Sequence, residues 1–62
     1  MTFRDYVIEK LRNDGDSTTK QIWQYLPPEG RAEMSPTVVH ENMEEMQKDG
    51  LVQIIKRHWR LA

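Results

Sequence analysis

The chain has 62 residues, 37% of them hydrophobic and 31% charged, and a formal net charge of −1. This length leaves room for one small domain, expected over residues 1–62, with too little core to enclose a deep substrate cavity. An enzyme is therefore not expected. The chain has no cysteine, and its two histidines, His40 and His58, are far apart in sequence, so we expect neither a metal site nor a cofactor.

Apolar runs in the chain are short. Each is only two or three residues long, such as Ile54-Ile55, far below the roughly 20 residues of a membrane span. The first residues include an acid and lack the apolar stretch of a secretory signal. These features predict a soluble, cytoplasmic protein with no membrane partner.

Two helices are expected in the first half of the chain. Thr2 is suited to cap a first helix, whose apolar side chains share one face until a turn sequence at 13–16 ends it. Ser17 or Thr18 then caps a short second helix that runs to about Leu26, where two prolines end it.

Residues 27–35 contain two prolines and a glycine, and this composition predicts a loop without regular structure. A third helix follows, because Ser35 is a good N-cap and Pro36 suits the first helical position. Its apolar residues recur at helical spacing until Asp49 and Gly50 end it: Val39, Met43 and Met46.

The last twelve residues alternate in the manner of a β-hairpin folded back about Lys56-Arg57. This fold places three residue pairs opposite each other: Ile54 with Trp59, Val52 with Leu61, and Gln53 with Arg60. Neither lysine nor arginine favours the positive φ of a two-residue turn, so a four-residue loop over 55–58 is predicted.

Large apolar side chains at core spacing are interpreted as the packed interior that so small a domain needs. This interpretation covers Phe3, Tyr6, Trp23, Met43, Met46 and Trp59.

Three helices followed by a hairpin make an α+β chain whose element order resembles a winged helix. The block SPTVVHENMEEMQKDGLV, residues 35–52, resembles the recognition-helix region of small winged-helix regulators. The layout of the chain resembles the small PapI-like and MarR-like DNA-binding modules. The resemblance implies sequence-specific binding of double-stranded DNA by a small transcriptional regulator, with the third helix in the major groove and the hairpin wing on the backbone.

Candidate DNA-binding residues fall into three groups. The third helix offers Ser35, Thr37, Val38, His40 and Glu41 toward base edges. The start of the second helix offers Thr18 and Lys20 toward phosphate, although capping explains Thr18 equally well. The hairpin offers Lys56, Arg57, His58 and Arg60, for which protection of an edge strand is the alternative.

The outward face of the third helix is acidic, with Glu41, Glu44 and Glu45 on or beside it. Its simplest interpretation is a solvated surface in which Glu44 and Glu45 pair with Lys48. A second functional interpretation is a module that binds a protein partner through this face, with Tyr25 as an exposed contact. We expect a monomer in dilute solution that pairs or becomes cooperative on DNA, because one module buries little DNA surface.

Overall fold

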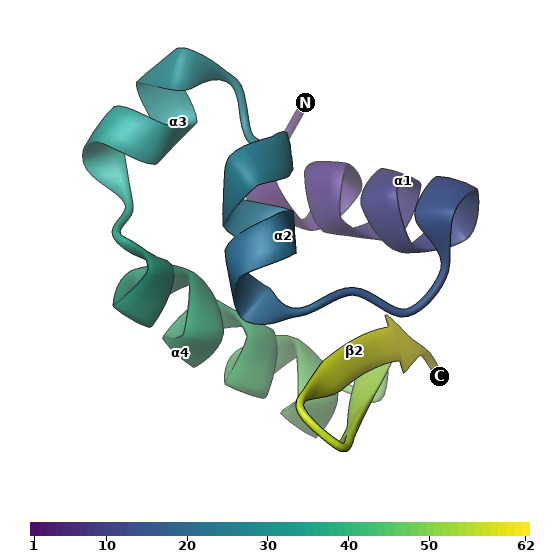
Figure 1. Ribbon diagram of the computed structural model, residues 1–62. Helices are drawn as coiled ribbons and strands as arrows, with labels where there is room; N and C mark the ends of the chain where they lie inside the picture. The colour runs from purple at the N-terminus through teal and green to yellow at the C-terminus, as the bar shows by residue number, and fades with distance from the viewer.

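The computed structural model describes residues 1–62 as four helices and a two-stranded antiparallel sheet (Figure 1). The helix α2 packs on α4, β1 packs on α4, and β2 packs on α1. The elements are α1 Phe3–Asp14, α2 Thr19–Tyr25, α3 Pro28–Glu33, α4 Pro36–Lys48, β1 Val52–Ile55 and β2 His58–Leu61.

The predicted helix starts are confirmed, because each begins at a side chain that caps it. Thr2 and Thr18 form capping boxes with Asp5 and Gln21, in which each member of a pair bonds the other's backbone N–H. The hydroxyl of Ser35 accepts the Val38 N–H at the start of α4. These local bonds fix where α1, α2 and α4 begin.

The loop predicted over residues 27–35 is wrong, since most of it forms the helix α3. Pro28 occupies the first helical position, where a missing N–H removes no helical bond. The guanidinium of Arg31 donates to the carbonyls of Gln24 and Leu26, at 2.9 and 3.1 Å. It thereby satisfies orphan acceptors at the end of α2 and ties α3 to that helix.

The predicted register of the hairpin is confirmed: Val52 pairs with Leu61, Gln53 with Arg60, and Ile54 with Trp59. The predicted four-residue loop is wrong, because Ile55 also pairs with His58 and leaves a two-residue turn. Lys56 and Arg57 have φ values of 50° and 67°, the left-handed region that a type I′ turn requires. Strand pairing therefore prevails over the backbone preference of these two residues.

The core lies where α1, α2, α4 and the hairpin meet. Met43, Met46 and Trp59 are buried as predicted, while Phe3, Tyr6 and Trp23 are half-buried and pack against the core. The buried apolar residues are Val7, Leu11, Ile22, Leu26, Val39, Met43, Met46, Val52 and Trp59.

Trp59 joins the hairpin to the start of α2. Its indole Nε1 donates to Thr19 Oγ1 at 2.9 Å, and its backbone exchanges two hydrogen bonds with Ser17. Ser17 is itself buried, and its hydroxyl donates to the carbonyl of Gly15. The strand β2 is thus held between β1 and Ser17, so the hairpin is fixed relative to α2.

None of the four helices combines the length and the apolar character needed to cross a membrane.

The cap of α1 predicts a pH dependence of stability. Hydrogen bonds from the backbone and side chain of Thr2 lower the pKa of Asp5 below its ordinary value of 3.8. A lowered folded-state pKa stabilises the fold above the unfolded value, and this contribution is lost as pH falls through the folded value. In thermal melts, Asp5→Asn should therefore be less stable than the parent near neutral pH, and the difference should close at acid pH. A difference that stays constant across this range would contradict the prediction.

Candidate nucleic-acid interface

The hairpin tip presents two cations to solvent. Lys56 and Arg57 form the turn, both are exposed, and neither makes a salt bridge within the chain. His58 is also exposed, and its Nδ1 donates to the carbonyl of Lys56 at 3.0 Å. The tip is therefore a solvated basic site with free guanidinium and ammonium groups.

Arg60 differs from the two tip cations. Its Nε lies 3.4 Å from Asp16 Oδ1, and both side chains are about half exposed. No local pattern in the sequence indicates this ion pair, because Asp16 lies 44 residues away from Arg60 along the chain. The pair is an exposed one, worth roughly 0–1 kcal/mol, but it reduces the positive charge that Arg60 offers to a partner.

The predicted residues at the start of α4 lie on its surface. Thr37, Val38 and Glu41 are exposed, and Ser35 uses its hydroxyl oxygen to cap the helix. Glu41 makes no ion pair within the chain. These side chains are available to a partner along the first two turns of α4.

The start of α2 lies beside the first turns of α4, because Thr19 Oγ1 is 3.2 Å from His40 Nδ1. The capping interpretation of Thr18 is correct, since its Oγ1 accepts the Gln21 N–H at 3.2 Å. Lys20 is exposed and unpaired within the chain. Of the two α2 candidates, only Lys20 has its polar group free.

His40 sits at the junction of three elements and is half-buried. Its Nδ1 lies 3.2 Å from Thr19 Oγ1 on α2, and its ring meets Trp59 of β2 edge-on, with centroids 5.6 Å apart. Its Nε2 lies 3.9 Å from the carboxylate of Glu44. Sequence reasoning did not connect Thr19 with His40, because no local pattern links residues 21 positions apart.

The acidic face of α4 is only partly neutralised. Glu45 pairs with Lys48 at 3.4 Å, as predicted, whereas the predicted Glu44–Lys48 pair is wrong because Glu44 faces His40 instead. Tyr25 is not the exposed contact that the sequence suggested. It is half-buried, and its hydroxyl donates to Glu9 at 2.7 Å, which raises the pKa of Tyr25.

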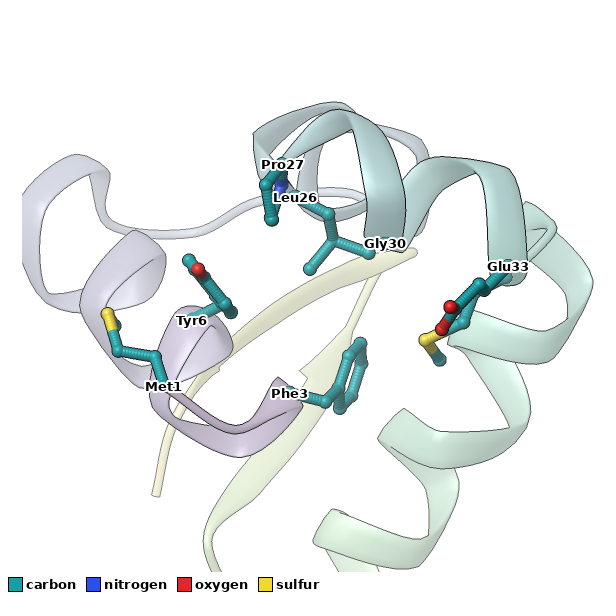
Figure 2. Close-up of a pocket in the computed structure, with 8 residues that line it drawn as sticks. Met1, Phe3, Tyr6, Leu26, Pro27, Gly30 and Glu33 are labelled. Carbon is teal, nitrogen blue, oxygen red and sulfur yellow. The ribbon is translucent and has the colours of Figure 1, made fainter.

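A hollow of about 290 Å³ lies between α1 and α3, and Figure 2 draws the residues that line it. In Figure 1, α3 lies on the side of the molecule away from the hairpin. Figure 2 shows Phe3, Tyr6 and Leu26 around the hollow, with Glu33 at one side. It brings together no acid–base pair and none of the predicted site residues. The chain also contains no group of three or more His, Cys, Asp or Glu residues placed to hold a metal ion.

Comparisons of the chain with family models, with curated proteins and with solved structures gave no match. The function must therefore be argued from the chain's own residues.

Proposed function

We propose that the chain is a winged-helix domain that binds double-stranded DNA as a small transcriptional regulator. In this proposal α4 enters the major groove and the hairpin lies against the phosphate backbone. The order of helices and hairpin supports it, as does the direct passage from α4 into β1. The helix α3 fills the connection between α2 and α4, where a tight turn is more usual.

One observation carries the proposal: two cations occupy a turn that neither residue favours. Holding Lys56 and Arg57 at positive φ costs roughly 1–2 kcal/mol per residue, whereas Asn-Gly adopts this turn readily. Strain retained at an exposed pair of like charges is typical of a functional site. The two tip residues are therefore better suited to binding an anionic partner than to stabilising the turn.

Edge protection explains the tip cations less well. Cations that protect a sheet edge stand on the edge strand itself, where they block pairing with another chain. The edge strand β1 has the sequence VQII and carries no charge, while Lys56 and Arg57 lie beyond its end. Their position favours contact with a partner at the tip.

The hairpin and α2 both carry free cations and are held in a fixed arrangement relative to each other. The bonds of Trp59 to Thr19 and Ser17 hold the hairpin against the start of α2, which carries Lys20. A phosphate backbone is a line of charges at fixed spacing, and it is bound best by cations that are already held in place. This rigid link supports simultaneous contact by the hairpin and α2.

The experiment is a titration of a generic DNA duplex at several salt concentrations. Three free cations at Lys20, Lys56 and Arg57 predict that log K falls with log salt at a slope of roughly −3. Fluorescence anisotropy of a labelled duplex measures this slope. No binding even at the lowest salt would overturn the proposal.

The unpaired carboxylate of Glu41 supports a second candidate, in which α4 binds a basic protein surface. The substitution Glu41→Lys distinguishes the two candidates. On DNA this substitution should raise affinity and steepen the salt slope by about one unit, because a repulsive charge becomes an attractive one. A protein-binding face would give no duplex binding in the parent or in the variant.

A further inference from the structure

The hydrogen bonds around His40 determine which ring nitrogen carries its hydrogen. The indole of Trp59 can only donate, so Thr19 Oγ1 accepts from it. The hydroxyl of Thr19 then donates its hydrogen to His40 Nδ1, which lies 3.2 Å from Thr19 Oγ1. We call these three hydrogen-bonded side chains the Trp59–Thr19–His40 relay. Every donor and acceptor in it has a partner when Nδ1 is the acceptor and the neutral ring carries its hydrogen on Nε2.

The hydrogen on Nε2 is not used within the protein. The carboxylate oxygen Oε1 of Glu44 is 3.9 Å from Nε2, beyond hydrogen-bond distance. The side chains of His40 and Glu44 are 45% and 57% exposed. An outward donor and an outward acceptor therefore stand side by side, one turn apart on α4.

We propose that His40 and Glu44 together read one base pair, selecting a keto base, guanine or thymine, on one strand. This inference rests on the DNA-binding function proposed above. In the major groove a keto base offers O6 or O4 as an acceptor, and its complement offers the N4 or N6 amino group as a donor. These two atoms are hydrogen-bonded to each other at about 3 Å, close to the separation of the His40 and Glu44 groups.

Reversing the base pair makes both contacts unfavourable. With adenine or cytosine on the selected strand, the imidazole N–H meets an amino group and the carboxylate meets a carbonyl oxygen. Each contact then sets donor against donor or acceptor against acceptor. The pair thus distinguishes keto from amino bases, and it explains why an acidic residue is useful on a helix that faces DNA.

Thr19 is a positioning residue in this scheme. Its hydroxyl contacts no base, yet it fixes the tautomer and the orientation of the imidazole. The relay runs from β2 through α2 to α4, so the hairpin that contacts phosphate also sets the group that reads the base.

The test is selection from a pool of DNA duplexes with a randomised central segment, followed by sequencing. The parent should select guanine or thymine over adenine or cytosine at one position, by on the order of tenfold. His40→Ala and Glu44→Ala should each abolish that preference while binding to the unselected pool is retained. Glu44 is exposed, so its variant remains informative even if His40→Ala lowers stability.

A matched control separates base reading from general charge effects. Glu45→Ala removes a carboxylate from the same helix, next to Glu44 in the sequence. This variant should keep the keto preference of the parent. If the parent binds duplex without such a preference, or keeps it after Glu44→Ala, the base-reading inference is wrong and the DNA-binding function stands. If the parent binds no duplex, both are wrong.

The positioning role has its own readout. Thr19→Val removes the hydroxyl and should weaken the keto preference while the salt slope stays unchanged, and Thr19→Ser should restore the preference. A purely structural role would lower the melting temperature in Thr19→Val without changing which base is selected. That outcome would overturn the role assigned to Thr19.

Discussion

Trp59→Ala is expected to remove much or all of the free energy that stabilises the fold at room temperature. The side chain is 1% exposed and fills the space between the hairpin, α1 and the start of α2. Removing a buried tryptophan costs roughly 3–5 kcal/mol. A chain of this size has a total stability of only about 3–9 kcal/mol, so the loss consumes much or all of it.

Circular dichroism during urea titration measures this effect. Leu61→Ala is the matched control, because Leu61 lies on the same strand but is 37% exposed. Its truncation should cost about 1 kcal/mol or less. A Trp59→Ala variant that unfolds at the urea concentration of the parent would show that Trp59 does not hold the hairpin to the helices.

The features that sequence reasoning predicted well are those fixed by short-range patterns. A helix start depends on one side chain and the backbone three residues later, which is why Thr2, Thr18 and Ser35 were identifiable. The hairpin register follows from the apolar residues on one face of the ladder, because a shift by one residue would expose Val52 and Trp59, the buried residue of each strand.

The errors arose where two local signals conflicted. Prolines both end and begin helices, and at Pro28 the second role holds because Arg31 secures α3 to the end of α2. At the hairpin tip, turn preference argued for a longer loop. Continued strand pairing up to Ile55 and His58 outweighed it.

The least predictable parts of the site are contacts between distant residues. The Arg60–Asp16 pair and the Thr19–His40 hydrogen bond join elements that only the packed core brings together. Both change the chemistry of a predicted candidate: one reduces the charge of Arg60, and the other fixes the imidazole of His40. Residue type suggested the candidate side chains, whereas the contacts that each of them makes within the chain depended on the fold.

At the hairpin tip, the residues proposed to bind DNA are not those that best stabilise the turn. The double substitution Lys56→Asn/Arg57→Gly separates the effect on stability from the effect on binding. Asparagine and glycine adopt the left-handed conformations of this turn with little strain, so the variant should be about 1–3 kcal/mol more stable than the parent. It also removes the two cations that are proposed to contact phosphate, so its salt slope for duplex binding should be smaller by about two units.

The variant Lys56→Ala/Arg57→Ala is the matched control, because it removes the same charges while leaving residues with a β-carbon at positive φ. Its salt slope for duplex binding should fall as in the first variant, while its free energy of unfolding should stay close to that of the parent. Urea titration and duplex titration on the three proteins give both quantities. If either double variant binds duplex with the parent's affinity and salt slope, the tip does not contact phosphate, and the proposed function loses the observation that carries it.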